Sequence, residues 1–448
     1  MKTSKRVIII GFSFAGKLAA RVLSEFFQEV WVFERDPLSE KPMPRKGIPQ
    51  SHQPHVLLKK GERLLTGFFP NVTEDLLQQG AVAFDFLKDV HWVHHGKQKV
   101  RVEREFGQLS LSRPLLDWVV QRRLEKIPNL KVYYETEVRG LIFGEASDVK
   151  GVRVASESGK ELEEVSADLV VDCSGAASFF MRALREEKQV VPTEETLGIN
   201  LAYTSRKVRL PQGYKRDWQA FLLYPDPPAL EKGGIIYPLE NEEWIISLFG
   251  YGGHHCETKE ETFLTFAESL SSPVLAETIR QATALSELKT YKVLKQVRRR
   301  MDKLRAPTEG LLVMGDALCR FDPVFGQGMT AACLEANVLQ QMARTARHKI
   351  GSSRFNQRLY KKFMRKLFPL WLMVLAEDFR YTKTKGTKPF GLRVLQRYMS
   401  KLYQASETDP IVYQRFAKVL HLLDSPFVLF FPSILWRVLI KGTRHREM

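Results

Sequence analysis

The chain has 448 residues, with 44% hydrophobic and 27% charged side chains. This composition is typical of a globular protein with two or three structural units, and it excludes disordered, collagen-like and low-complexity classes. The four cysteines form no Cys-x-x-Cys pair, so we expect a reducing compartment and neither a disulfide scaffold nor a zinc module. Most of the formal charge of +17 falls in residues 340–448, which hold 22 Lys and Arg against 6 Asp and Glu. Such a basic region favours an anionic surface, namely membrane lipid, nucleic acid or an acidic partner.

The first elements along the chain form a β-α-β unit. Residues 6–10 are a short apolar run, typical of a strand that is covered on both faces. A glycine turn follows, and residues 17–27 then have the apolar spacing of a helix. Residues 30–33 form a second apolar strand, which ends at Glu34. We therefore expect a parallel sheet at the start of the fold.

The pattern changes near residue 193. Before it, periodicity predicts helices over 55–69 and 112–127, and strands over 131–138, 149–154 and 167–171. After it, runs separated by turn residues predict an antiparallel sheet, with strands at 198–208, 221–224, 234–238 and 244–249. The later patterns predict a helix over 259–285, a strand over 311–314, a helix over 328–347 and basic helices from residue 355.

The turn after the first strand has the sequence Gly11-Phe12-Ser13-Phe14-Ala15-Gly16. A glycine turn at a helix N-terminus lets backbone amides approach a pyrophosphate. Gly11 makes the tight turn, Gly16 allows close packing of helix on strand, and Ser13 replaces the middle glycine of the usual motif. Glu34 can accept hydrogen bonds from a ribose. Together these features predict dinucleotide binding, with an ordinary strand–turn–helix as the alternative.

A second glycine-rich segment lies far away in the sequence. The strand at 311–314 runs into Gly315-Asp316, and the chain continues as Pro323-Val324-Phe325-Gly326-Gln327-Gly328-Met329-Thr330. Two glycines and a proline before a helix present accessible backbone and a second positive helix end. This suits a pyrophosphate or the carbonyl side of a flavin ring, although spacing alone also fits a plain glycine-rich loop.

Together these motifs resemble the FAD-dependent monooxygenases of the aromatic-hydroxylase and squalene-epoxidase type, over residues 5–345. The segment Arg45-Lys46-Gly47-Ile48-Pro49-Gln50-Ser51-His52-Gln53-Pro54-His55 is similar to a subgroup of bacterial epoxidases that act on polyketide polyenes of the polyether type. Ser112-Arg113-Pro114 resembles the helix start whose arginine reaches FAD. The resemblance implies the following cofactor-binding residues: Gly11, Ser13, Phe14, Ala15, Gly16, Glu34, Arg35, Arg45, Arg113, Val138, Gly315, Asp316, Pro323, Gly326, Gly328 and Met329.

The resemblance also implies a fold and its division. We expect an α/β protein with a Rossmann-like FAD-binding domain of parallel sheet and β-meander, an inserted antiparallel-sheet substrate domain and a helical C-terminal region. Residues 1–192 would begin the FAD-binding domain and residues 291–347 would complete it. Residues 193–290 would form the substrate domain, and residues 348–448 the basic helical region.

One departure from the family concerns the electron source. Many single-component hydroxylases carry an Asp-Gly motif tied to NADPH use, where this chain has Ser174-Gly175. That substitution resembles halogenases, styrene-type epoxidases and prenyl reductases. NADPH or NADH would then supply electrons either directly or through a separate flavin reductase as partner. Against a halogenase, the sequence has no Trp-x-Trp-x-Ile-Pro run.

The resemblance implies oxygen insertion through a flavin C4a-hydroperoxide, by epoxidation or hydroxylation of a lipophilic polyene or terpenoid, with O2 as co-substrate. The cofactor carries the hard step, so no catalytic side chain is assigned. A prenyl-chain reductase of the geranylgeranyl type is one alternative, because it would saturate a double bond within the same fold. A non-catalytic, membrane-associated flavin protein is another.

Several other residues have competing interpretations. Direct catalysis by the loop residues His52 and His55 is less favoured than a structural role. The pairs His94-His95 and His254-His255 are interpreted as solvated or loop histidines, and no metal is expected. Cys173 and Cys319 are expected to be buried as small apolar residues. Sheet packing and lining of an apolar pocket over the flavin both stay open for Tyr224, Tyr237 and Phe249.

The basic tail suggests where the protein works. Residues 363–371 and 426–439 combine large apolar side chains with Arg and Lys, as in helices that lie in a membrane interface. A basic helical cap on the flavin domain is the alternative. No segment reaches the ~20 apolar residues needed to span a bilayer. We expect a cytoplasmic protein, with peripheral attachment to the inner face of the membrane as an option, and no nucleic-acid partner because no such motif is present.

Overall fold

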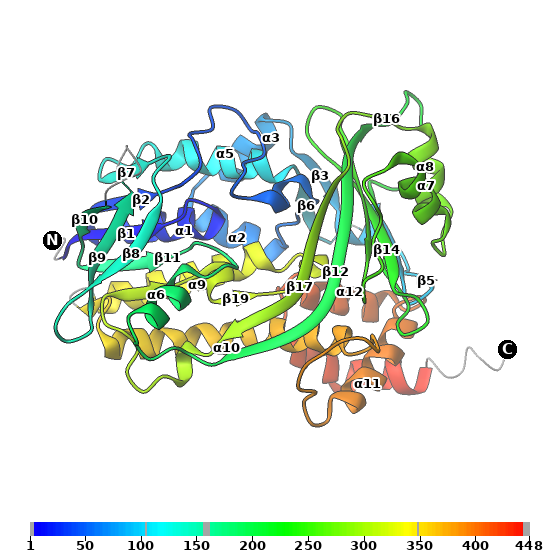
Figure 1. Ribbon diagram of the computed structural model, residues 1–448. Helices are drawn as coiled ribbons and strands as arrows, with labels where there is room; N and C mark the ends of the chain where they lie inside the picture. Colours follow the sequence, from blue (N-terminus) through cyan, green and yellow to red (C-terminus); the bar gives the residue numbers. More distant parts are fainter. Residues whose placement is uncertain (1–3, 104, 156–161, 347–348, 442–448) are drawn as a thin grey trace.

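The computed structural model describes residues 4–103, 105–155, 162–346 and 349–441. A parallel five-stranded sheet in the order β18-β11-β1-β2-β7 forms its first half (Figure 1). These strands are, in that order, Leu311–Val313, Leu169–Asp172, Ser4–Ile10, Phe27–Phe33 and Leu130–Tyr133. Val7, Ile8 and Ile9 are completely buried, because both faces of this sheet are covered.

Helices and a small antiparallel meander cover the parallel sheet. Helix α1 (Phe14–Leu23) contacts α5 (Arg113–Leu124) and α9 (Gly328–Thr345). The meander consists of β8 (Val138–Phe143), β9 (Val149–Ala155) and β10 (Leu162–Ser166), and β9 packs against β11. This is the predicted Rossmann-like arrangement.

A nine-stranded sheet forms the second half, in the order β19-β17-β12-β15-β14-β13-β4-β5, with β16 paired to β12. Its pairs are antiparallel except that β13 runs parallel to β4. Figure 1 shows β12 and β17 as long strands that lead from the parallel sheet into this second sheet. The strands are β19 (Cys319–Arg320), β17 (Lys289–Arg299), β12 (Glu194–Arg209), β15 (Trp244–Gly250), β14 (Lys232–Pro238), β13 (Ala220–Leu223), β4 (Val90–His94), β5 (Lys97–Gln98) and β16 (Thr283–Ala284).

Short elements complete the two halves. A two-stranded sheet pairs β3 (Val82–Asp85) with β6 (Gly107–Ser110). The other helices before the tail are α2 (Lys59–Phe68), α3 (Val72–Gln78), α4 (Phe86–Asp89), α6 (Phe179–Glu186), α7 (Glu260–Glu268) and α8 (Val274–Gln281). The 3₁₀ turns are η1 (Pro49–His52), η2 (Met301–Lys303), η3 (Gly315–Ala317) and η4 (Pro323–Phe325).

The basic tail packs on both halves of the molecule. Helix α10 (Ser353–Asp378) packs against α9, and the backbone amide of Val313 donates to the Tyr360 hydroxyl at 3.0 Å. The later tail elements pack on the second sheet, where Tyr413 and Phe416 join Trp92 in one apolar cluster. These elements are α11 (Leu392–Ala405), α12 (Pro410–Leu420), η6 (Pro426–Phe430), α13 (Pro432–Trp436) and the π-helix η7 (Arg437–Lys441). Within the described part of the chain, no helix combines the length and hydropathy needed to cross a membrane.

The predicted fold class is confirmed, and local differences have physical causes. The helix predicted over 259–285 is two helices, α7 and α8, because Pro273 begins the second one and has no amide hydrogen to continue the first. The strands β4 and β17 were not predicted. Strand β4 adds to the second sheet from outside residues 193–290, and β17 extends beyond residue 290. The Lys- and Arg-rich sequence of β17 lacks the alternation of a half-buried strand.

Candidate active site

The first glycine turn is held by close backbone contacts. Gly11 has φ +90°, and its amide donates to the Phe33 carbonyl at 2.9 Å. A Cβ on Gly11 would lie 2.9 Å from the Cys173 carbonyl oxygen, and one on Gly16 would lie 2.0 Å from the Gly11 carbonyl oxygen. Neither position admits a side chain, so the sequence folds here into the tight strand–turn–helix that brings backbone amides to one point.

Glu34 lies beside this turn, at the end of β2. Its Oε2 atom accepts a hydrogen bond from the Phe12 amide at 2.8 Å and lies 3.2 Å from Arg45 Nη1. Arg45 also donates from Nη2 to the Phe12 carbonyl at 3.0 Å. The structure therefore places Glu34 and Arg45 together against the turn, where a ribose acceptor was predicted, and gives both an additional role in fixing the turn.

A buried charged group beneath the turn was not predicted. Lys17 in α1 is completely buried and donates from Nζ to the Phe12 carbonyl at 3.0 Å. Burial lowers its pKa to about 8, while Asp117 at 3.7 Å opposes that shift. Asp117 in turn accepts from Arg113 Nε at 2.9 Å, and Arg113 Nη2 donates to Ser13 Oγ at 3.2 Å. Arg113 thus reaches the glycine turn through Ser13.

The second glycine segment meets the first at Ala15. Gly315 has φ +66°, and a Cβ there would lie 2.6 Å from the Ala15 Cβ. Its amide donates to Glu335 Oε2 at 2.7 Å, and burial raises the pKa of Glu335 to about 8. Burial also raises the pKa of Asp316, although nearby arginines oppose that shift. Glu335 was missed by sequence reasoning, although it is the only acidic residue in α9.

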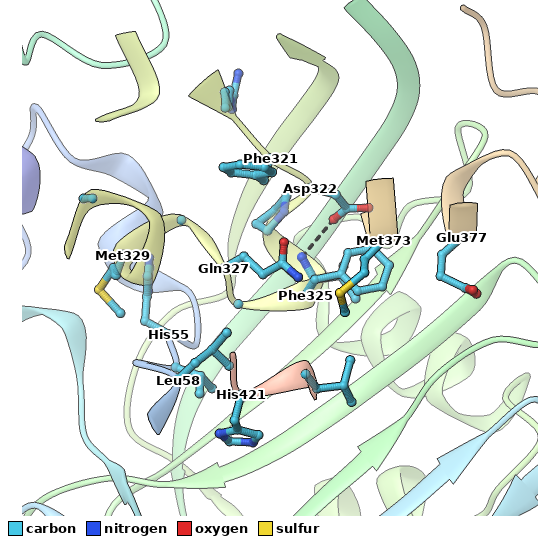
Figure 2. A pocket seen from close by; sticks show the side chains of 18 of the residues that line it. His55, Leu58, Phe321, Asp322, Phe325, Gln327, Met329, Met373, Glu377 and His421 are labelled. Carbon is cyan, nitrogen blue, oxygen red and sulfur yellow. Dashed lines mark hydrogen bonds between the residues drawn. The ribbon is translucent and has the colours of Figure 1, made fainter. Parts of the chain in front are cut away.

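The loop over residues 323–328 is fixed from two sides. The Val324 amide donates to Asp322 Oδ1 at 2.8 Å, the bond drawn as a dashed line in Figure 2. The Tyr251 hydroxyl donates to Asp322 Oδ2 at 2.7 Å, and the Tyr224 hydroxyl donates to the Val324 carbonyl at 2.8 Å. Burial raises the pKa of Asp322 to about 6. Gly326 takes φ +64° at the end of the turn.

These segments line one cavity of about 670 Å³. It runs from the first glycine turn to the second sheet and the tail helices. Of the residues proposed for cofactor binding, those that line it are Ser13, Phe14, Ala15, Arg113, Gly315, Asp316, Pro323, Gly326, Gly328 and Met329. Gly11, Gly16, Glu34 and Arg45 support the turn from behind. Arg35 is exposed and Val138 is buried in the core, and neither of them lines the cavity.

The part of the cavity beyond the loop is mainly apolar and aromatic. Tyr224, Tyr237 and Phe249 all line it, so these sheet residues do face a pocket. Figure 2 shows His55 and Met329 on one side of the loop, and Met373 and Glu377 of α10 on the other. Burial lowers the pKa of His55 to about 4, so its imidazole is neutral near pH 7. Cys173 also lines the cavity, and Cys173 and Cys319 are both buried as expected.

The interpretation as a solvated or loop histidine is wrong for His94, whereas His95 does lie in the turn after β4. His94 ends β4 and is 6% exposed, because β4 pairs with β13 and the tail helices cover that side of the sheet. One ligand atom each of His94, His95 and Glu377 lies within 4.8 Å of the other two. Local sequence carried no signal for this group, because Glu377 is 283 residues away from His94 in the chain. The pair His254 and His255 is exposed, as expected.

The residues around the cavity fit a flavin dinucleotide. An added Cβ on Gly175 or Gly328 would meet nothing within 4 Å, so these backbones border open space. The side-chain oxygens Gln327 Oε1 and Thr330 Oγ1 are buried without a hydrogen-bond partner in the part of the chain that the structure describes. Two helix starts, α1 and α9, adjoin the cavity, which suits the phosphates of such a cofactor.

Comparison with known proteins agrees with this site. Residues 4–347 match the family model described as "FAD binding domain", so the chain belongs to this family of FAD-binding proteins. The chain is 27% identical over 446 residues to Protein Rv3254 of Mycobacterium tuberculosis (strain ATCC 25618 / H37Rv), covering 98% of this chain and 94% of that protein.

More distant relatives include squalene epoxidases 1 and 3 of Arabidopsis thaliana, at 22% and 24% identity over 76% of this chain. The chain spans about three fifths of their length, 60% of each. Among solved structures, the flavin-dependent brominase Bmp2 superposes with TM-score 0.67 at 13% identity, covering 98% of this chain and 99% of Bmp2. p-Nitrophenol 4-monooxygenase PnpA of Pseudomonas putida DLL-E4 gives TM-score 0.66 at 16% identity, covering 95% and 100%. These likenesses show the fold.

Proposed function

We propose that the protein is a FAD-dependent monooxygenase that inserts one oxygen atom, by epoxidation or hydroxylation, into a lipophilic polyene or terpenoid. The observation that carries this proposal is the continuity of one cavity, which joins the glycine segments of the cofactor site to an apolar chamber under the second sheet. A substrate in that chamber would lie directly against the loop over residues 323–328. The matches to squalene epoxidases support an unsaturated hydrocarbon chain as the reacting part.

Bound and reduced FAD would supply the oxygen chemistry, with one atom of O2 entering the substrate and the other leaving as water. The chain's own residues bind and orient. The turn at Gly11 and the positive ends of α1 and α9 would hold the phosphates, and Arg113 supports the turn through Ser13. Tyr224 fixes the loop backbone at Val324. The aromatic walls exclude water, and no side chain needs to act as acid or base in an epoxidation.

The electron source is proposed to be NADPH or NADH, acting through a separate flavin reductase. Ser174-Gly175 stands where an Asp-Gly motif is tied to direct NADPH use in related hydroxylases. The local geometry is that of a tight turn: Asp172 accepts hydrogen bonds from the amides of Ser174 and Phe180, each at 2.8 Å. Both side-chain oxygens of Asp172 are thus used for the backbone.

The mouth of the cavity supports peripheral attachment to an anionic membrane on the cytoplasmic face. Phe368, Phe427 and Phe430 line the cavity and are 51%, 77% and 41% exposed. Arg365 lines the same opening. Aromatic side chains next to basic ones suit a lipid interface and would admit a lipophilic substrate from it. Among the basic residues near the end of the tail, Arg437 pairs with Asp409 at 2.7 Å, and the side chains of Lys441 and Arg444 lie outside the described residues.

An oxygen electrode tests the proposal. FAD-loaded protein is supplied with NADPH and a flavin reductase, and squalene or farnesol is added in detergent. A monooxygenase consumes more oxygen, and less of it appears as hydrogen peroxide, when the substrate is present. Saturation of a double bond without stoichiometric oxygen use would instead establish a prenyl-chain reductase. Bound flavin with no change of any substrate, under any electron donor, would establish a non-catalytic flavin protein.

A further inference from the structure

A buried histidine ring lies in the mainly apolar wall of the chamber. His94 lines the cavity, and among the residues that the structure describes its Nδ1 atom is buried without a hydrogen-bond partner. The rings of Trp92, Tyr403 and Phe416 surround it, with centroids at 5.0, 4.5 and 6.5 Å. Burial lowers the pKa of His94 well below its usual value, so the ring is neutral and has one donor and one acceptor. An unpaired buried nitrogen is unfavourable, so a ligand group that pairs with it would be stabilised here.

Glu377 lies beside His94 and lines the same part of the cavity. Its Oε1 atom accepts from the Tyr403 hydroxyl at 2.6 Å, and its Oε2 atom lies 3.1 Å from Arg380 Nε and 3.5 Å from His95 Nε2. Although burial opposes ionisation, His95 and Arg380 hold the pKa of Glu377 below its usual range. The Glu377 carboxylate is therefore ionised. Its negative charge is balanced by groups of the tail helices and of the turn after β4.

The arrangement discriminates between ligand groups by charge. A carboxylate or phosphate would meet the Glu377 anion and would be repelled. A metal ion would compete with Arg380 for Glu377, while the Nδ1 atom of His95 is already 2.9 Å from Asp226 Oδ1. A hydroxyl group fits, because it donates one hydrogen bond and accepts others. Because both oxygens of Glu377 already have partners, the hydroxyl would donate to His94 Nδ1, in the tautomer that carries its proton on Nε2, and would lie beside Glu377.

We propose that His94 and Glu377 bind a single uncharged hydroxyl group of the substrate, so that the substrate is a lipophilic alcohol and not a pure hydrocarbon or an acid. This inference rests on the proposed function, because it names the substrate class of that same chamber. The surrounding side chains Met373, Met399 and Phe416 are apolar and also line the cavity. One polar group in an apolar wall fixes the orientation of an otherwise apolar ligand.

The position of the site relative to the cofactor loop sets the direction in which the substrate lies. The Tyr224 ring contacts His94 on one side, with centroids 5.7 Å apart, and Phe325 on the other, 6.5 Å apart. Figure 2 shows Phe325 in the loop, with Met373 beside it and Glu377 farther from the loop. A hydroxyl bound at His94 therefore leaves the hydrocarbon chain to pass Tyr224 toward the loop. The oxidised carbon lies away from the hydroxyl end.

Binding of a matched ligand series to the FAD-loaded wild-type protein tests the proposal without turnover. The probes are farnesol, farnesyl methyl ether and farnesoic acid, measured by the change in flavin absorbance or fluorescence. Farnesol is expected to bind about tenfold more tightly than its methyl ether, which cannot donate, and than the acid. Equal binding of all three, or tighter binding of the acid, would overturn the proposal.

The variant His94→Leu is expected to bind farnesol and its methyl ether equally while it keeps FAD. The matched control Met399→Leu changes another cavity residue and should keep the wild-type preference. A preference that survives in His94→Leu would contradict the assignment, as would a stoichiometric metal in purified wild-type protein that this variant loses. Preference for the alcohol with no oxygen insertion would refute only the proposed reaction, whereas oxygen insertion without that preference would refute only the hydroxyl site.

Discussion

The hydroxyl of Tyr224 donates a hydrogen bond to the carbonyl oxygen of Val324 at 2.8 Å. Tyr224 follows β13 of the second sheet, and Val324 lies in the loop that borders the cofactor end of the cavity. This partly buried hydrogen bond thus ties the substrate chamber to the cofactor site. Shifts in the sheet caused by a bound substrate can reach the loop through this contact.

Removing that hydroxyl should loosen the loop. In Tyr224→Phe the Val324 carbonyl loses its hydrogen-bond donor. The loss of such a bond costs about 1 kcal/mol of folding free energy. We expect FAD affinity to fall about three- to tenfold, as measured by fluorescence titration of the apoprotein. Tyr214→Phe is the matched control, because that hydroxyl pairs with Thr278 in α8 at 2.7 Å and Tyr214 does not line the cavity. Unchanged FAD affinity in Tyr224→Phe would show that the bond does not support the cofactor loop.

Glu335 should act as a neutral acid that positions Gly315. Its pKa of about 8 means that the carboxyl is protonated in the folded state near pH 7, so Glu335→Gln should retain FAD, whereas Glu335→Ala should lose it because the Gly315 amide is left unpaired. The raised pKa contributes stability that is fully present below about pH 4.5 and is lost as pH rises through 8. The stability of Glu335→Gln relative to the wild type should therefore rise between pH 5 and pH 8, by about 1.4 kcal/mol per pH unit, as measured by denaturation. A constant difference would contradict a neutral Glu335.

His421 should make the protein sensitive to acid. It packs edge-on against Phe86 and Phe106, with centroids at 4.5 and 4.7 Å, and burial lowers its pKa to about 3. The unfolded chain takes up a proton below about pH 6.5 while the folded chain does not, so this stability is lost as pH falls from 6.5 toward 3. We expect the deficit of His421→Asn relative to wild type to shrink by about 2 kcal/mol between pH 7 and pH 4.5.

Urea denaturation at these two pH values measures that change. The exposed His255 provides the comparison, because His255→Gln should follow the wild type at both pH values. A His421→Asn deficit that does not depend on pH would mean that His421 is protonated inside the fold.

The cavity mouth should bind lipid. Replacing Phe427 and Phe430 by Ser removes two exposed aromatic side chains, each worth about 1.5–3 kcal/mol when buried in an apolar phase. Sedimentation with vesicles that contain phosphatidylglycerol should show at least about tenfold weaker binding. Leu162→Ser, an exposed apolar residue in the meander, should leave binding unchanged. An equal loss of vesicle binding in both variants, or no vesicle binding by the wild type, would contradict membrane attachment at the cavity mouth.

Much of the fold could be predicted because its signals are local. The apolar run at residues 6–10 and the glycine turn after it encode a strand, a turn and a helix within one short stretch, and the structure has them there. Strand β17 could not be predicted, because its Lys and Arg side chains pair with acidic residues from a distant strand, such as Arg299 with Glu194. That pairing exists only once β12 and β17 lie side by side.

The candidate site likewise has one part that the sequence predicts and one part that it does not. The residues at Gly11–Gly16 and Gly315–Gly328 carry short motifs, so the sequence predicts the cofactor end. The substrate end is built from His94, Tyr224 and Glu377, which come from three separate parts of the chain. Nothing near His94 in sequence indicates that a carboxylate will lie beside it, and only the packing of α10 and α11 against β4 brings them together.

Mass spectrometry of products formed under ¹⁸O2 tests the central claim most directly. FAD-loaded protein would be supplied with NADPH, a flavin reductase and an unsaturated lipophilic probe such as farnesol. The account predicts a product that carries one labelled oxygen atom, with the second labelled atom in water, and no such product when FAD is omitted. A product that has gained two hydrogen atoms and no label, or unchanged probe with all the oxygen recovered as hydrogen peroxide, would contradict it.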